Sequence, residues 1–295
     1  VLLWRLSDWR PRGRGSVASL RDMAPFSVSL MLTDLISTFY MKLPQFFLGK
    51  LYPTATLGAF DQAVKLKDMP VTAATQSVQS VTFPALSEVR GDAPKFAESY
   101  RQVVLITAYV MFPAMLGLSA VAHDLFALLL SEKWMPTVPY FEVVCLAGLF
   151  YPVGMICYNV LKVMSRGPLI VRLEVVKKLL MTVVFAVTIP HSVMAVVWGL
   201  VVIAFGEMAV NFLATRRFTR FTTRRFLRTL LPVALVSGTM YLLVRLTACA
   251  VPGHLLLRLA AQLLVGAAAY VGLSVLFRLE AFGLLCDLMK KQAAR

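Results

Sequence analysis

Apolar runs of about 20 residues constrain this chain most, because a helix of that length crosses a bilayer. Eight such runs are found, at residues 26–49, 54–86, 100–121, 138–161, 170–190, 193–215, 226–249 and 255–279. Hydrophobic residues make up 59% of the chain and charged residues 15%, against about 45–50% and about 25% in soluble domains. The sequence therefore predicts an all-α, polytopic membrane protein with eight transmembrane helices.

Lysines and arginines are unevenly distributed between the connections. Most of the 30 lie in alternate connections that include the N-terminal segment, and the opposite connections hold only Lys50, Lys133 and Arg258. By the positive-inside rule, both termini are predicted to be cytoplasmic. The densest cluster, RRFTRFTTRRFLR at Arg216–Arg228, connects two predicted spans. We therefore expect it to contact anionic membrane lipids, and we expect no nucleic-acid partner.

A polar stripe runs along the second predicted span. Its members recur at steps of three or four residues, so they lie within roughly 80° of one another on a helix. They are Asp61, Lys65, Asp68, Thr72, Gln76 and Gln79. Charges at the centre of a bilayer cost at least about 2.5–3.5 kcal/mol each and must be compensated.

Two explanations account for the charges in this stripe. Lys65 is four residues from Asp61 and three from Asp68, so local pairing on one helix is possible. Pairing does not explain why Thr72, Gln76 and Gln79 continue the stripe, which favours a water-filled cavity. Asp34 in the first span is a further candidate, either as a functional acid or as a helix–helix hydrogen-bonding group.

Sequence signatures of enzyme chemistry are missing. The chain has no GxSxG, no HExxH and no Walker-type glycine loop, and its connections are short. The four cysteines show no metal-ligand spacing, and their residue type suits helix packing. We therefore expect no catalytic residues, no metal and no cofactor.

FFLGKLYPTATLGAFDQAVKL and TFPALSEVRGD (Thr82–Asp92) resemble two segments of the polysaccharide flippases of the multidrug/oligosaccharidyl-lipid/polysaccharide exporter superfamily. The first is similar to the passage between that family's seventh and eighth helices, and the second to the end of the eighth. LLLSEKWMPTVPYFEVVCLAGLFYP at Leu128–Pro152 resembles the family's KW-x-P-x-x-P and CLAG segment. The WRPR at Trp9–Arg12 fits the linker before helix seven.

The resemblance implies a domain organisation. Members have two six-helix lobes around a central cavity, and this chain corresponds to the second lobe. Residues 1–24 are then a cytoplasmic basic linker following a truncated span, and residues 25–218 the six-helix lobe. Residues 219–282 are a terminal helix pair, and residues 283–295 a cytoplasmic tail. The first lobe is expected to be missing, which agrees with the start at Val1.

The resemblance also implies a function: flipping of a lipid-linked oligosaccharide across the bacterial inner membrane by alternating access. Lys65 would attract the polyprenyl diphosphate, and Thr72, Gln76 and Gln79 would bind sugar hydroxyls. Asp61 and Asp68 would tune Lys65, and Asp34 or Asp61 would couple transport to energy. The chain departs from the family's pattern at Pro44 and at Phe60-Asp61-Gln62, where an acid and an arginine are common. The alternatives are a multidrug-type exporter of the same superfamily and a membrane enzyme of polysaccharide assembly.

Overall fold

The structure is a computed structural model that describes residues 38–40, 42–164, 167–219, 221–250 and 254–285. The chain divides into two compact units, Val1–Phe46 and Phe47–Arg295. In the first unit, the described residues 38–40 and 42–46 are helical. The predicted linker at 1–24, Asp34 and most of the first predicted span lie outside the described residues.

The second unit contains only helices and their connections in its described part. Its elements are α3 (Thr54–Glu88), α4 (Ala93–Ala120), α5 (Ala122–Leu129), the 3-10 helix η1 (Glu132–Thr137), α6 (Val138–Val163), α7 (Gly167–Thr188), α8 (Val193–Thr219), α9 (Thr223–Ala250) and α10 (Leu255–Leu276). The all-α prediction is thus confirmed for the described residues.

Five of the described helical segments are long and apolar enough to cross a membrane. They are Ala93–Ala120, Glu132–Val163, Val193–Thr219, Thr223–Ala250 and Leu255–Leu276. Helices α3 and α7 form where spans were predicted, but four charged residues interrupt the apolar sequence of each. The predicted number of eight transmembrane helices therefore stays a prediction.

The connection predicted around residues 123–136 is helical. It folds as α5, of eight residues, followed directly by η1. A helix of eight residues is about 12 Å long, which is too short to cross a bilayer. This segment therefore packs at one end of the helices, where α5 contacts α10 and α6.

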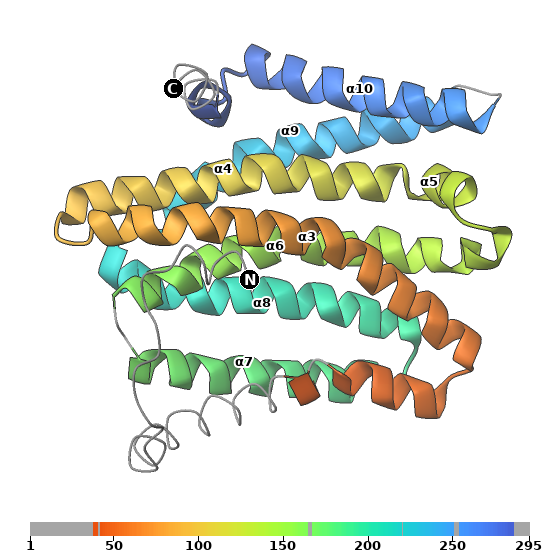
Figure 1. Cartoon of the computed structure of the whole chain (residues 1–295), viewed down its shortest axis with the longest axis horizontal. Helices are drawn as coiled ribbons and strands as arrows, with labels where there is room; N and C mark the ends of the chain where they lie inside the picture. Colours follow the sequence, from red (N-terminus) through yellow and green to blue (C-terminus); the bar gives the residue numbers. More distant parts are fainter. Residues whose placement is uncertain (1–37, 41, 165–166, 220, 251–253, 286–295) are drawn as a thin grey trace, which may run out of the picture. The chain divides into compact units, whose positions relative to one another are not determined.

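Helix α3 has 35 residues and is longer than a bilayer requires. Figure 1 shows that α3 changes direction part-way along its length. Pro70 and Pro84 lie inside this helix, and a proline removes a backbone donor and bends a helix.

Between α3 and α4 the chain turns sharply, and Asp92 caps the new helix. Its carboxylate accepts a hydrogen bond from the Lys95 backbone N–H at 3.1 Å. That hydrogen bond and the Lys95 ammonium hold the pKa of Asp92 below its usual value.

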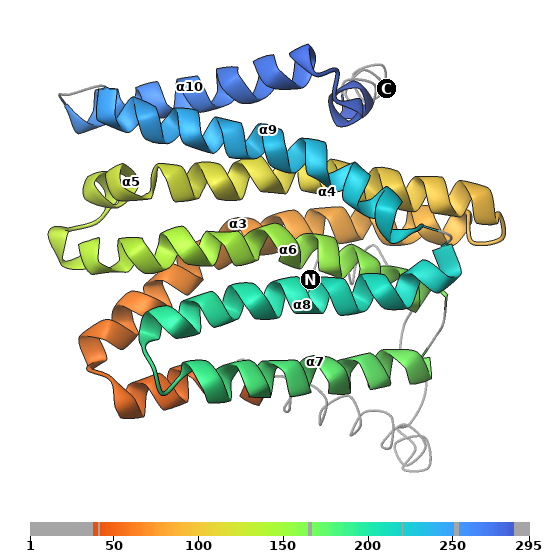
Figure 2. The ribbon, with the colours of Figure 1, turned by 180° about the vertical axis from the view of Figure 1, so that it is seen from behind.

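Helix α6 occupies the centre of the second unit and contacts α3, α4 and α8 (Figures 1 and 2). Its residues Val153, Ile156, Cys157 and Val160 are buried. The approach to α8 is close, since a Cβ atom at Gly154 would lie 3.1 Å from the Met208 Cα. Glycine at this position therefore allows the two backbones to meet.

Helices α9 and α10 pack against each other, and α9 also packs along α4 (Figure 2). Two polar contacts link α10 to α4: the Tyr109 hydroxyl donates to Ser274 Oγ at 3.0 Å, and the Tyr270 hydroxyl donates to the Tyr109 carbonyl at 2.6 Å. At the other end of α10, Arg258 Nε donates to Asp124 Oδ2 on α5 at 2.7 Å. Side-chain pairs thus fix the terminal helices to the rest of the unit.

Candidate functional site

Helix α3 presents one face to the protein core and another face away from it. Phe60, Ala63 and Val71 are buried. A Cβ atom at Gly148 of α6 would lie 3.1 Å from Cγ2 of Val71, so the two helices are in close contact there. Thr75 is also buried, and its hydroxyl donates to the Val71 carbonyl at 2.6 Å. The core face of α3 therefore packs on α6, and its buried Thr75 hydroxyl is hydrogen-bonded within the same helix.

The six predicted stripe residues lie on the remaining face of α3. Lys65, Thr72 and Gln76 are exposed, and Asp61, Asp68 and Gln79 are half-buried. The side chains of Lys65, Thr72, Gln76 and Gln79 have no hydrogen bond or ion pair within the part of the chain that the structure describes. The stripe is therefore one accessible polar surface on a helix whose other face is packed.

Asp68 pairs with Lys67 rather than with Lys65. The Lys67 Nζ lies 2.5 Å from Asp68 Oδ1, and the Lys67 side chain is only 15% exposed. The sequence did not predict the Lys67–Asp68 pair, because pairs on a helix are expected at spacings of three or four residues, and adjacent residues point in different directions. The pairing leaves the Lys65 ammonium available to a ligand.

Asp61 is different from the other members of the stripe. Its Oδ1 atom is buried and has no hydrogen-bond partner among the described residues. An unpaired buried carboxylate oxygen is costly, and such groups in native proteins call for an explanation. Asp61 is therefore a candidate for a group that acquires a partner during function.

A polar side chain of a neighbouring helix lies near the stripe. Tyr151 of α6 is 44% exposed and is within electrostatic range of Asp68 on α3 and of Glu207 on α8. Glu207 is in turn within electrostatic range of Lys177 on α7. Spacing along one helix could not reveal this grouping, because it arises from the packing of α3, α6, α7 and α8.

Lys177 is buried, which is unusual for a lysine. Its Nζ lies 2.5 Å from Glu174 Oε1 and 4.8 Å from the centre of the Tyr158 ring. The Nζ of Lys162 lies 4.7 Å from the same ring. Two cations thus contact one aromatic ring between α6 and α7, an arrangement that the sequence did not predict.

This surface offers cations, carboxylates, hydroxyls and amides along several turns of α3. Such groups can bind an anionic group together with several hydroxyls. Within the described ranges, no group of three or more His, Cys, Asp or Glu is placed to hold a metal ion.

Comparison with known proteins supports the resemblance found in the sequence. Residues 1–139 match the family described as "Polysaccharide biosynthesis protein". The lipopolysaccharide biosynthesis protein WzxC of Escherichia coli is 25% identical over 146 residues, covering 50% of this chain and 30% of WzxC. An uncharacterised membrane protein in the cps region of Klebsiella pneumoniae is 24% identical over 209 residues, covering 70% of this chain and 42% of that protein.

Structural comparison gives the same picture of the fold. The inward closed conformation of the lipid II flippase MurJ superposes with a TM-score of 0.74 and 13% sequence identity, covering 90% of this chain and 57% of MurJ. The chain spans less than half the length of the two sequence relatives. The chain is thus similar to polysaccharide biosynthesis proteins over residues 1–139, and its fold is similar to that of a lipid II flippase.

Proposed function

We propose that this chain forms part of a transporter that flips a lipid-linked oligosaccharide across the bacterial inner membrane by alternating access. The observation that carries the proposal is the accessible polar face of α3, which has a packed core face behind it. The relatives named for lipopolysaccharide biosynthesis and lipid II flipping support it.

Lys65 is the residue that we assign to the diphosphate of a polyprenyl-linked substrate. It is exposed and has no ion pair within the described residues, whereas Lys67 is engaged by Asp68. Thr72, Gln76 and Gln79 continue the same face and offer donors and acceptors to sugar hydroxyls. A lipid-linked sugar carries both an anionic group and many hydroxyls, so it fits this surface better than a drug-like cation does.

A second lobe facing α3 would complete the cavity. In this proposal a preceding six-helix lobe covers the polar stripe from the other side, and the two lobes rock between inward-open and outward-open states. The fraction of MurJ that the chain covers agrees with a partial transporter. The arginine-rich segment between α8 and α9 favours an orientation with both ends of this chain in the cytoplasm.

Energy coupling is assigned to a carboxylate. Asp61 has a buried oxygen without a hydrogen-bond partner among the described residues, so a proton or a cation at that position would satisfy it. Asp34, which lies outside the described residues, remains the second candidate for this role.

The test is the Lys65→Ala variant, expressed from its natural gene in cells whose own copy is deleted. A hydrogen bond to a charged group is worth about 1.5–3 kcal/mol, so we expect export of the sugar polymer to fall about 10- to 100-fold. Membrane abundance should not change, because the exposed Lys65 side chain makes no hydrogen bond or ion pair within the described residues. Export is measured as surface polysaccharide, and abundance by immunoblot.

Lys95→Ala is the matched control. Lys95 is an exposed lysine at the start of α4, and its side chain is 75% exposed. This variant should export normally. Normal export by Lys65→Ala at normal abundance would remove Lys65 from the site and with it the proposed mode of substrate binding.

A further inference from the structure

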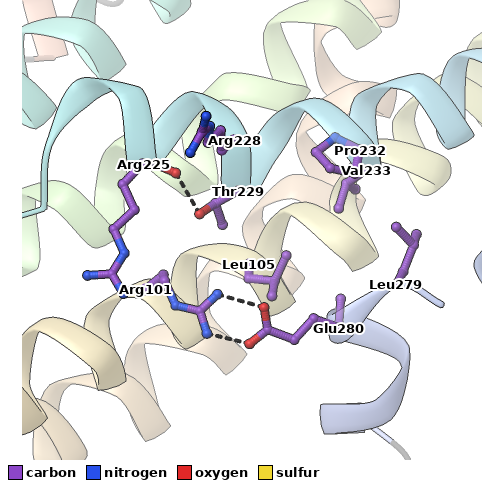
Figure 3. Close-up of a pocket in the computed structure, with 10 residues that line it drawn as sticks. Arg101, Leu105, Arg225, Arg228, Thr229, Pro232, Val233, Leu279 and Glu280 are labelled. Atoms are coloured by element: carbon purple, nitrogen blue, oxygen red, sulfur yellow. Dashed lines mark hydrogen bonds and ion pairs between the residues drawn. The ribbon is translucent and has the colours of Figure 1, made fainter. Parts of the chain in front are cut away.

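A pocket of about 430 Å³ lies between α4, α9 and the short helical segment at residues 280–285. It is separate from the polar face of α3. Its charged lining residues are Arg101 from α4, Arg225 and Arg228 from α9, and Glu280 (Figure 3). Leu105, Val233 and Leu279 supply part of its apolar wall.

The carboxylates of two glutamates bind the Arg101 guanidinium. Its Nη1 donates to Glu280 Oε2 at 2.8 Å, and its Nη2 donates to the other oxygen of the same carboxylate (Figure 3). Glu98, one turn earlier on α4, accepts from Arg101 Nε at 3.1 Å. Only 14% of the Arg101 side chain is exposed, so the guanidinium sits at the base of the pocket.

Arg225 and Arg228 are exposed and have no ion pair within the described residues. Three arginines and one glutamate line the pocket, so its lining carries a positive excess. A guanidinium binds the oxygens of a carboxylate or of a phosphate with the same bidentate geometry. Glu280 therefore occupies the position on Arg101 that a phosphate oxygen would take.

The residues that line the pocket favour a lipid over a soluble anion as its ligand. The pocket lies where α9 begins, and leucine, valine and proline side chains line it beside the arginines. Basic pockets between transmembrane helices bind the head groups of anionic lipids, whereas a free phosphate gains nothing from an apolar wall. The mixed lining fits a phosphate ester that carries acyl chains.

We propose that this pocket binds the phosphate group of an anionic phospholipid, and that Glu280 occupies Arg101 when the lipid is absent. Lipid binding displaces the Glu280 carboxylate and so releases the segment at 280–285 from α4. The pocket is then a site at which the anionic lipid content of the membrane acts on the terminal helices. The inference does not depend on which substrate the α3 surface binds.

The experiment measures retention of phosphatidylglycerol by the purified full chain in nanodiscs of phosphatidylcholine, with native mass spectrometry as the readout. Each basic residue near a membrane surface contributes close to fivefold in binding, so Arg225→Gln with Arg228→Gln should weaken retention about 30-fold. Glu280→Gln should strengthen retention about fivefold, because it removes the competing carboxylate from Arg101.

Arg172→Gln is the matched control, since Arg172 is an exposed arginine on α7 outside the pocket. It should leave retention unchanged. An equal loss per charge removed in Arg172→Gln would overturn the proposal, because retention would then follow net charge alone. No gain in Glu280→Gln would also overturn it, because Glu280 would then not compete with the lipid for Arg101. Displacement of the lipid by 10 mM inorganic phosphate would identify a soluble anion as the ligand and would also overturn it.

Discussion

Two parts of this protein carry polar side chains whose surroundings differ: in one part they are paired with one another, and in the other several lack a partner within the described residues. Where α10 meets α4 and α5, polar side chains meet one another: Tyr270 with the Tyr109 carbonyl, Tyr109 with Ser274, and Arg258 with Asp124. Along α3, by contrast, Lys65 and the carboxylate oxygen of Asp61 lack partners within the described residues.

We infer from this difference that the paired groups serve helix packing and that the unpaired groups of α3 serve the proposed transport. A polar group that is paired contributes to the packing of helices, and its removal should reduce stability. A polar group that is kept at a cost without a partner has a use other than packing. Substitutions in the two parts should therefore affect different measured quantities, stability in one and transport in the other.

The largest loss of stability is expected for Arg258→Ala. The Asp124 side chain is 4% exposed, and this substitution leaves its carboxylate buried without a guanidinium. Breaking a buried pair on one side costs about 3 kcal/mol. The measurement is thermal unfolding in a fixed detergent.

A double-mutant cycle with Asp124→Asn sharpens this result. The double variant should be less destabilised than the sum of the two single variants, since neither charge is left alone. Simple additivity would show that the pair does not connect α5 to α10 energetically.

Acidic pH should also weaken the contact between Asp124 and Arg258, by less than the Arg258→Ala substitution does. Burial opposes the charge on Asp124, but its hydrogen bonds to Arg258 and His123 prevail and hold its pKa below the usual value. A carboxyl with a lowered pKa stabilises the fold above its ordinary pKa of about 3.9, and that contribution is lost as the pH falls through its folded value.

The unfolding temperature of the unmodified protein should therefore drop as the solution becomes more acidic than about pH 4. The Asp124→Asn variant should show less of this acid-dependent drop. An identical drop in both proteins would place the responsible carboxylate elsewhere. The effect is smaller than that of Arg258→Ala because a protonated carboxyl still accepts a hydrogen bond.

Tyr270→Phe tests a single neutral hydrogen bond in the same region. The Tyr270 hydroxyl donates to the Tyr109 carbonyl at 2.6 Å, and hydrogen bonds between membrane helices average about 0.6 kcal/mol. We expect a loss of that size in the unfolding free energy. Tyr241→Phe on α9 is the control, because the Tyr241 hydroxyl has no hydrogen bond within the described residues.

The sequence predicted the helices of this protein well, because runs of apolar residues depend only on local composition. The predicted spans at 54–86, 138–161 and 193–215 correspond to α3, α6 and α8 within a few residues. The sequence also identified the polar stripe, because its members share one helix and a period of 3.6 residues.

Pairs between distant parts of the chain could not be predicted in this way. Asp124 and Arg258 are 134 residues apart, and Arg101 and Glu280 are 179 apart. Periodicity within one helix gives no information about which helices pack together. For the same reason, the sequence did not place Tyr151 of α6 beside Asp68 of α3.

The smallest effect on stability, with a large effect on transport, is expected for Asp61→Ala. The substitution removes a carboxylate whose buried oxygen has no partner in the described part of the chain, so the unfolding temperature should stay the same or rise. Export should fall at least about 10-fold if Asp61 carries the coupling proton or cation, since one such interaction is worth about 1.5–3 kcal/mol. Surface polysaccharide and thermal unfolding are measured on the same variant.

The paired measurement decides how Asp61 is to be classified. A loss of stability close to that of Arg258→Ala would mean that the carboxylate has a structural partner, and Asp61 would then belong with the packing groups of α4, α5 and α10. Unchanged stability with unchanged export would leave the buried oxygen without a role and would return the coupling assignment to Asp34. Only lost export at full stability supports the view that α3 keeps its polar groups unpaired for transport.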